Sequence, residues 1–448
     1  MAATLFLALG ALISTRAQAA DAPRPVPAAA REMAAAFINS HYADWDALYK
    51  HLHTHPELSY HEEQTSRRIA GELRGAGFEV TEKVGGFGVV GVLRNGAGPT
   101  VLLRTDLDAL PVKEQTGVPY ASQAMTKDDN GNEVSVMHAC GHDVHMTVFS
   151  ATARTLARLK DYWSGTIVMI GQPAEERGGG ARKMLADGLF TRFPKPDRCV
   201  ALHVAANLPA GTVGHVEGYA MANVDSVDIT FRGVGGHGAW PHTTKDPVVL
   251  AAEAIMAFQT IVSRETEPGQ AAVVTVGSIH GGTKHNIIPD EVKLQLTLRS
   301  YTDQVRSNTI TSLQRICKNM ALAAGVPEDR LPTVKRDEEE FTRALYNDPA
   351  LTLQLAGAVG GWLGADKVVS ARAVMGGEDF NEYGRTADKI PISLLWLGAV
   401  EPGRFVESQK SGAALPSLHS AFFAPAPEMT IKTGVTSMAA VVLELLGK

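Results

Sequence analysis

The densest group of potential metal ligands lies in the stretch MHACGHDVH, residues 137–145. Cys140 and His142 are separated by a single glycine, so in an extended or turning backbone both side chains can face one ion. Thiolate and neutral imidazole are good ligands for zinc and its neighbours in the first transition row. Asp143 and His145 are candidates for further ligands, or for hydrogen-bond partners that fix an imidazole tautomer. The stretch predicts a metal site, and a polar turn around a buried thiol is the alternative. A helix is predicted to follow it over 147–160.

Two adjacent acids, Glu175 and Glu176, follow an apolar strand predicted over 165–170. In such a pair one carboxylate can bind a metal, while its neighbour, turned elsewhere, takes a proton from water that the metal has activated. A solvated acidic pair is the alternative. Because the pair follows a buried strand and does not lie on a helix face, the sequence favours the catalytic interpretation.

Two further predicted strands carry ionisable side chains at their ends. The strand predicted over 100–105 leads into Asp106 and Asp108, and the strand predicted over 198–203 ends in His203. Open α/β sheets bind ligands outside the carboxyl ends of their strands. We expect one of the two acids to orient a metal-binding imidazole while the other stays solvated, with a pair of turn-forming acids as the alternative. Together with the Cys/His stretch and the Glu pair, these ends predict one crevice.

Length and composition restrict the class of protein. The chain has 448 residues with 45% hydrophobic content, which predicts a globular protein with a large core and roughly three domains. A net charge of -6 and the lack of a basic run argue against nucleic acid as a partner. Beyond the N-terminus no stretch is apolar enough to predict a membrane helix. Cys140, Cys199 and Cys317 are too few and too scattered for a disulfide framework, and the last two are expected to be buried.

The N-terminal residues 1–20 resemble a secretory signal. An apolar core from about Leu5 to Ile13 is followed by a small-residue AxA pattern that ends at Ala19. The segment lacks a basic residue before the apolar core, which is unusual for such a signal. The apolar core and the AxA pattern nevertheless predict export to the periplasm or the medium, with a cytoplasmic location as the alternative.

Two other motifs are assigned no chemistry. His51, His53, His55 and His61 form a second histidine cluster, but a turn that positions the following helix is favoured over metal ligation. Residues 86–91 formally match GxGxxG, yet they lead into more strand and not into a helix, so a dinucleotide site is rejected.

The order of predicted elements indicates an insertion. After residue 220 the pattern is strand, helix, two strands, helix and strand, predicted over 223–233, 246–264, 271–279, 291–299, 302–324 and 330–334. This βαββαβ order is typical of a small ferredoxin-like domain. Because α/β patterning resumes afterwards, we predict an α/β catalytic domain from 31–219 and 336–448, interrupted by an α+β domain over 220–335 that contains His237 in a glycine-rich loop.

The motifs in their order resemble one family. HPELS, RTDLDALP, HACGHDVH, QPAEE, GGHGAWPH, HNIIPD, GGEDF and LHS are similar to the M20 metallopeptidases and amidohydrolases. The similarity is greatest to the branch of hippurate hydrolases, N-acyl-amino-acid amidohydrolases and auxin-conjugate hydrolases. It implies a metallopeptidase-type catalytic domain with two divalent ions, Zn, Mn or Co, and an inserted lid domain through which the protein forms a homodimer.

The resemblance also implies roles for individual residues. Glu175 would be the general base, and the metal ligands would be Cys140, His142, Glu176, His203 and His419. His237 would help to stabilise the oxyanion, reaching into the partner subunit's site, and Asn286 would contact the substrate. In the wider family a histidine ligand stands at the position of Asp106. Asp106 and Asp108 are therefore candidates for residues that hydrogen-bond to the metal ligands and orient them. Gly377 stands where the branch often has serine.

The implied function is metal-dependent hydrolysis of the amide bond of N-acyl amino acids or related small conjugates. A metal-dependent dipeptidase or carboxypeptidase, and a ligand-binding member without turnover, are the alternatives. A hydrolase with Cys140 as nucleophile is a further one. The acyl group, the amino acid and the native metal are not specified by these motifs.

Overall fold

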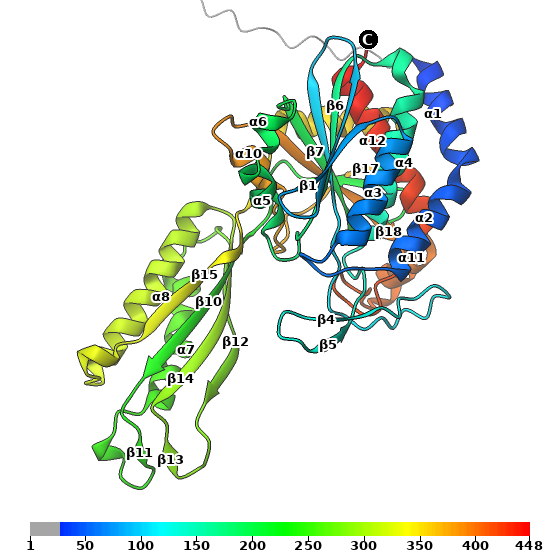
Figure 1. Ribbon diagram of the computed structural model, residues 1–448. Coiled ribbons are helices and arrows are strands. Elements are labelled where there is room, and N and C mark those ends of the chain that lie inside the picture. Colours follow the sequence, from blue (N-terminus) through cyan, green and yellow to red (C-terminus); the bar gives the residue numbers. More distant parts are fainter. Residues whose placement is uncertain (1–26) are drawn as a thin grey trace, which may run out of the picture.

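The computed structural model describes residues 27–448. It consists of a large α/β body and an elongated four-stranded body that projects from it (Figure 1). The predicted signal, residues 1–20, lies outside the described residues.

The large body is built on an eight-stranded sheet. In spatial order its strands are β1 (Glu79–Val84), β2 (Gly88–Asn95), β6 (Gly165–Gln172), β3 (Thr100–Asp106), β7 (Arg198–Pro209), β18 (Ile392–Val400), β8 (Val213–His215) and β17 (Val368–Ser370). β6, β3, β7 and β18 are parallel. Parallel strands covered on both faces are apolar throughout, which explains the continuous runs VLLRT, TIVMI and ISLLWLGAV. β2 confirms that the GxGxxG match continues as strand.

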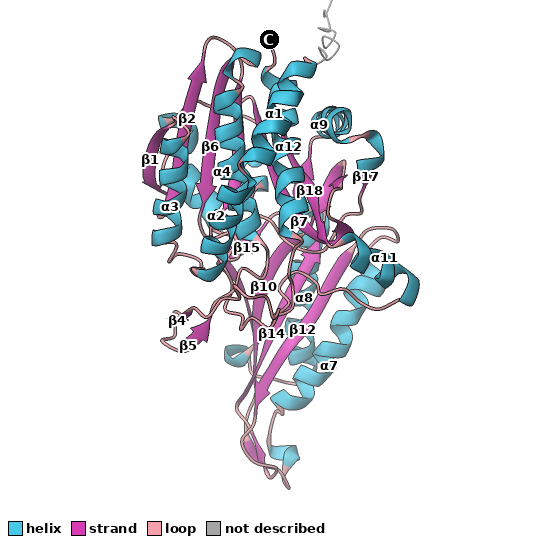
Figure 2. Cartoon of the chain, turned by 90° about the vertical axis from the view of Figure 1, so that its right-hand side faces the viewer, coloured by secondary structure: helices cyan, strands magenta, loops and turns pink. Residues whose placement is uncertain are grey.

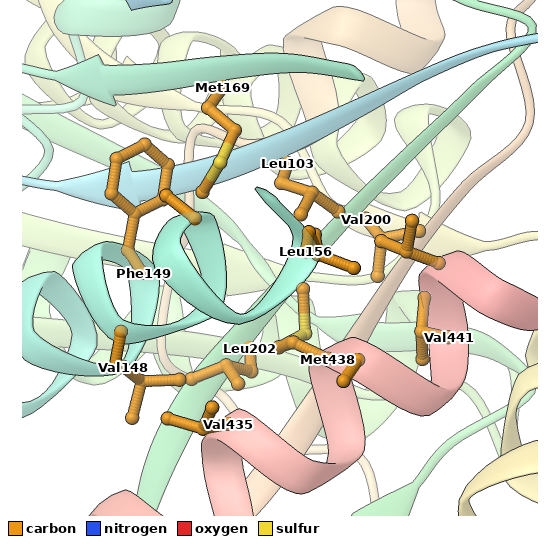
Figure 3. Packing of buried hydrophobic residues seen from close by; sticks show 14 of the residues in the cluster. Leu103, Val148, Phe149, Leu156, Met169, Val200, Leu202, Val435, Met438 and Val441 are labelled. Atoms are coloured by element: carbon orange, nitrogen blue, oxygen red, sulfur yellow. The ribbon is translucent and has the colours of Figure 1, made fainter. Parts of the chain in front are cut away.

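Helices cover both faces of this sheet (Figures 1 and 2). On one face lie α1 (Ala28–Ser40), α2 (Tyr42–Thr54), α3 (Glu63–Gly75), α4 (His142–Arg158), α9 (Pro349–Leu363) and α12 (Pro427–Leu446). On the other lie α5 (Gly180–Ala186), α6 (Leu189–Arg192) and α10 (Asn381–Arg385). Successive residues of β3 serve opposite faces: Leu103 packs toward α4 and α12, and Leu102 belongs to the second cluster. Figure 3 shows the first of these cores, with Val148 of α4 and Val435 of α12 among its residues.

The four-stranded body follows the predicted βαββαβ order. Its sheet has the spatial order β12 (Ala272–Gly281), β14 (Glu291–Ser300), β10 (Asn223–Arg232) and β15 (Thr333–Thr342), and α7 (Pro247–Thr260) and α8 (Asp303–Ala323) pack on one face. β15 pairs with β10 as far as Thr342, so this sheet extends past the boundary expected at residue 335. The short strands β11 (Gly236–His237) and β13 (Ile287–Ile288) lie at its far end (Figure 1).

Smaller elements complete the chain: β4 (Met125–Lys127), β5 (Glu133–Ser135), β9 (Gly218–Met221), β16 (Leu345–Asn347) and α11 (Pro402–Ser411). Contrary to the expectation that no later stretch is apolar enough, the described segments Pro247–Glu265 and Pro427–Leu446 have the length and hydropathy of a membrane span. The second is α12, with 72% of its apolar window buried in the core. Helices α1 and α2 meet at His41.

Gly434 allows α12 to pack closely against α4. A Cβ at Gly434 would lie 2.7 Å from Cγ2 of Val148, a stiff and buried side chain. We expect Gly434→Ala to lower the free energy of unfolding by about 1 to 3 kcal/mol, because overpacking outweighs the better helix propensity. The exposed Gly357 of α9 has no atom within 4 Å of its Cβ position, so Gly357→Ala is the matched control and should stabilise. Denaturant midpoints measure both, and a stabilised Gly434 variant would contradict the packing argument.

Candidate active site

The Cys/His stretch forms the start of α4. This helix begins at His142, whereas the sequence predicted a helix only from about residue 147. Gly141 precedes it with φ of 77°, and a Cβ there would lie 2.6 Å from Cγ2 of Val204. The position therefore requires glycine for its conformation and for its contact with β7. His142 is held on the first turn of a buried helix, with Cys140 just ahead of it.

Hydrogen bonds fix the tautomers of two histidines. Nδ1 of His142 donates to the carbonyl oxygen of Asp108 at 2.8 Å, and Nδ1 of His203 donates to that of Val204 at 2.8 Å. In each ring the other nitrogen, Nε2, is turned toward the candidate ligand group. Nε2 of His203 lies 3.5 Å from Sγ of Cys140. His203 was expected at a strand end but lies within β7, which continues to Pro209.

Candidate ligand atoms without hydrogen bonds have the spacing expected around a metal ion. Nε2 of His142 and Oε1 of Glu176 are buried, have no hydrogen-bond partner among residues 27–448, and lie 3.7 Å apart. Ligands of one tetrahedral ion with bonds of 2.0–2.3 Å are separated by about 3.3 to 3.8 Å. Cys140, His142 and His203 form one group of candidate ligands, and Cys140, Glu176 and His419 form another, each within 4.8 Å. The donor set of thiol, imidazole and carboxylate fits divalent ions that share Cys140.

His419 comes from a loop near the C-terminus. Its φ is 64°, and its backbone N–H donates to the carbonyl of Ala139 at 2.9 Å, which ties this loop to the Cys/His stretch. Its Nε2 lies 3.4 Å from Oε2 of Glu176. The side chain is 55% exposed, so His419 forms the outer wall of the ligand group.

His145 and Asp106 support the ligands and are not ligands themselves. Nδ1 of His145 donates to Oδ1 of Asp106 at 2.8 Å, and Nε2 of His145 accepts from the backbone N–H of Val204, also at 2.8 Å. Both ring nitrogens are therefore occupied. The other oxygen of Asp106 accepts from Arg104 at 2.7 Å. Although Asp106, His142 and His145 are close enough to hold an ion, their hydrogen bonds assign Asp106 and His145 to positioning.

A second set of hydrogen bonds positions the Glu pair. Asp106 and Asp108 are both fully buried, so the expectation that one of them stays solvated is wrong. Oδ2 of Asp108 accepts from the hydroxyl of Ser59 at 2.6 Å and from the backbone N–H of Glu176 at 3.0 Å. The buried carboxylate of Glu62 accepts from the N–H of Ala174 at 2.7 Å, where φ is 49°. A non-glycine residue in this region is costly and needs support from its surroundings. The turn that presents Glu175 and Glu176 is thus held from two sides.

Glu175 faces the crevice without a partner. Its carboxylate accepts no hydrogen bond within the described part of the chain, and Oε2 lies 3.9 Å from Nε2 of His142. Burial and the neighbouring carboxylates of Glu378 and Glu176 raise the pKa of Glu175 well above its usual value. Glu175 lines a pocket of about 990 Å³ together with Cys140, Glu176, His203 and His419. Its position suits proton transfer to and from a group bound in this pocket.

The chemistry of Cys140 disfavours the cysteine-nucleophile alternative. Burial, followed by the carboxylates of Glu176 and Glu175, raises the pKa of its thiol well above the usual value. A catalytic cysteine needs a lowered pKa and an adjacent cation or base. A thiol among carboxylates ionises when a cation binds it, so the surroundings favour ligation.

The motifs did not predict a buried ion network behind the Glu pair. The fully buried Arg104 donates to Asp106, to Glu378 at 2.8 Å and to Asp379 at 3.2 Å. Glu378 and Asp379 belong to the GGEDF motif, and Asp379 also accepts from Gln172 at 2.6 Å. The motif therefore supplies the counter-charges of Arg104, a role for which the sequence carried no separate signal.

The second histidine cluster contains one buried member. Nδ1 of His53 lies 2.6 Å from Asp143, and its Nε2 lies 3.1 Å from Glu114. Burial opposes protonation of His53, but the two carboxylates overcome it and raise its pKa to about 10. The imidazolium therefore connects α2 to the residue next to His142. His53 is not a ligand, in agreement with the prediction.

His237 and Asn286 are not brought to this pocket. His237 lies exposed on β11, paired with Ile287 of β13, and its ring centroid lies 4.8 Å from that of Trp240. Both strands lie at the far end of the four-stranded body (Figure 1). Neither residue lines the pocket, so within one subunit the structure separates them from the other predicted site residues.

Comparison with known proteins agrees with this arrangement. A profile of the peptidase family M20/M25/M40 matches residues 102–418. The chain belongs to the M20 peptidase family. The chain is similar to thermostable carboxypeptidase 2 of Saccharolobus solfataricus, with 34% identity over 90% of this chain and 96% of that protein. It is also similar to hippurate hydrolase of Campylobacter jejuni, with 38% identity over 62% of this chain and 70% of the relative.

A solved structure of the family shows the same fold. It is the YXEP protein of Bacillus subtilis, described as a dinuclear metal binding peptidase, with 27% identity and a TM-score of 0.72. The match covers 92% of this M20 chain and 99% of that one. The predicted family, its fold and the class of metal-dependent amidohydrolases are confirmed.

We expect His53→Ala to destabilise the M20 protein strongly. Removal of the imidazolium leaves the carboxylates of Asp143 and Glu114 without their shared cation, which costs on the order of 3 kcal/mol. His55→Ala is the matched control, because His55 is exposed and its loss should change stability by less than about 0.5 kcal/mol. Urea unfolding in excess chelator excludes effects of metal binding. Equal shifts for the two variants would contradict the role of His53.

Proposed function

We propose that this M20 enzyme hydrolyses the amide bond of N-acyl amino acids or related small conjugates. The observation that carries the proposal is the unpaired carboxylate of Glu175, which faces the pocket beside the candidate ligands. Relatives include both a hippurate hydrolase and a carboxypeptidase, so cleavage of peptide bonds is the second candidate. A binding protein without turnover would have no need of a buried, unpaired acid at this position.

Five side chains would hold the metal, which we take to be two ions of Zn, Mn or Co. The thiol of Cys140 is common to both groups, and the other ligands are His142, Glu176, His203 and His419. When bound, these ions supply Lewis acidity that polarises a carbonyl and acidifies water. Asp106, Asp108 and His145 keep the imidazoles in orientation through the hydrogen bonds described above.

The residues of the chain then act on protons and orientation. Glu175 accepts a proton from the attacking water and delivers it to the nitrogen of the leaving amine. Its burial removes competing solvent, and the turn held by Glu62 and Asp108 keeps its carboxylate toward the pocket. Apolar side chains of the wall, among them Leu208, Trp396 and Leu418, exclude water from the substrate.

Substituting Glu175 and Glu176 one at a time distinguishes the role of general base from that of metal ligand. We expect Glu175→Gln to reduce kcat by roughly 100- to 10,000-fold with metal content unchanged, because the base is lost while every ligand remains. Glu176→Gln should lower the metal content itself. Amine release from acetyl, benzoyl and indole-acyl amino acids and from dipeptides, with metal analysis of the same samples, checks both results. Retained turnover in Glu175→Gln would refute the base assignment.

We further propose a homodimer in which His237 acts in the partner subunit's site. The outer surface of the four-stranded body carries exposed apolar side chains, with Val249 and Met256 of α7 and Ile279 of β12 more than half exposed. β12 is an edge strand of its sheet, so its outer backbone groups are free to pair with another chain. An association through this surface would bury it and complete a site that lacks His237 and Asn286 within one subunit.

Mixing two inactive variants tests this arrangement. Glu175→Gln and His237→Ala should each be inactive alone, since one lacks the base and the other the oxyanion donor. If subunits redistribute randomly, the mixture should recover about a quarter of wild-type activity, because half of the dimers contain one intact site. A mixture as inactive as its components would show that His237 does not act across the interface.

A further inference from the structure

The pocket wall carries positive charge that no acid balances. Besides Glu175 and the ligand group, its charged residues are Arg177, Arg299, Glu340 and Arg372. Arg177 is paired, since its Nε donates to Glu340 at 2.6 Å and it also binds Asp129. Arg299 and Arg372 form no hydrogen bond or ion pair within residues 27–448. Two guanidinium groups are therefore available to a bound molecule.

Arg299 is held in place without a counter-ion. It lies half-buried on β14, opposite Val224 of β10, on the face of the sheet that α7 and α8 leave open. The nearby carboxylate of Asp225 is taken up by Arg306, which donates from Nε at 2.6 Å. Burial lowers the pKa of Arg299, and Asp225 opposes this shift. A desolvated cation of this kind is stabilised when an anion binds.

Arg372 is not needed to hold its own segment. Residues 371–377 are fixed by their backbone: Val374 bridges Met221 in parallel orientation, and the carbonyl of Gly376 accepts from the N–H of Ala222 at 2.8 Å. The side chain of Arg372 is exposed and lines the pocket. Nothing in the fold of this segment accounts for a charged residue here, whereas an anionic ligand would.

The two arginines occupy opposite ends of one wall. Arg299 lies opposite Val224 in the sheet. Val374 pairs in parallel with Met221, so Arg372, two residues earlier, lies near the start of β9. Five residues of extended chain separate these positions, about 16 Å at 3.2–3.4 Å per residue. Backbone positions this far apart allow the two guanidinium groups to hold separate anionic groups of one ligand.

We propose that Arg372 is a specificity-determining residue that binds a second anionic group of the substrate, in addition to the group bound at Arg299. The preferred substrate is then a doubly anionic amide, such as an N-acyl amino acid with a carboxylate in its side chain or in its acyl group. This inference rests on the proposed function for its substrate class, but binding tests it without turnover.

The test compares charged and neutral isosteres on metal-loaded Glu175→Gln protein, with and without Arg372→Ala. Calorimetry gives Kd for N-acetyl-L-glutamate against N-acetyl-L-glutamine, and for N-succinyl-L-leucine against N-pentanoyl-L-leucine. We expect one charged member to bind on the order of 10- to 100-fold more tightly than its isostere, and Arg372→Ala to abolish this preference. The pair that responds identifies the position of the second anion.

Controls separate this inference from net charge and from the proposed function. Arg198→Ala removes an exposed arginine at the start of β7, outside the pocket, and should leave the preference intact. Arg372→Lys should restore part of it. No preference in either pair, or a preference that survives Arg372→Ala, would overturn the inference. Selective binding by Glu175→Gln combined with no hydrolysis by the wild-type enzyme would instead overturn the proposed function alone.

Discussion

The guanidinium of Arg104 is the fixed positive charge around which the catalytic edge of the large sheet is assembled. It is fully buried and contacts Asp106, Glu378 and Asp379, while Glu175 lies close enough to Glu378 for repulsion to raise its pKa. Acids outnumber cations in this region. Because a buried charge without a partner is costly, the excess of carboxylate and thiol makes the site a strong attractor for divalent ions. The ion network and the ligand group are therefore one electrostatic unit.

Local pattern predicted much of this unit. Apolar runs identified β3, β6 and β7, and the rule that ligands gather at carboxyl ends of parallel strands brought Asp106, the Glu pair and His203 to one crevice. The pattern failed where a contact overrides local preference. The start of α4 at His142 depends on Gly141 packing against Val204, and the length of β15 depends on its partner β10. Neither contact is visible in a window of sequence.

Pairings between residues far apart in the sequence were missed for the same reason. Arg104 meets Glu378 across 274 positions of chain, and His53 meets Asp143 across 90, so their types alone carried no information about pairing. The residue after the Glu pair is a further example. Arg177 binds Glu340 of β15 and Asp129 of the β4–β5 hairpin, which makes the catalytic turn a junction between the two bodies. Any movement of the four-stranded body must carry or break these contacts.

The pairing of β7 with β18 governs the order in which the protein can assemble. Cys199 lies opposite Ile392, and the whole four-stranded body is contained in the chain between them. The four-stranded body has its own core, so its folding brings the two ends of the inserted chain together. This reduces the entropy that is lost when β18 pairs with β7. His419 follows β18 in the sequence. During synthesis the candidate metal centre can therefore be completed only after nearly all of the chain, including the insertion, has been made, so a truncated product has no complete centre.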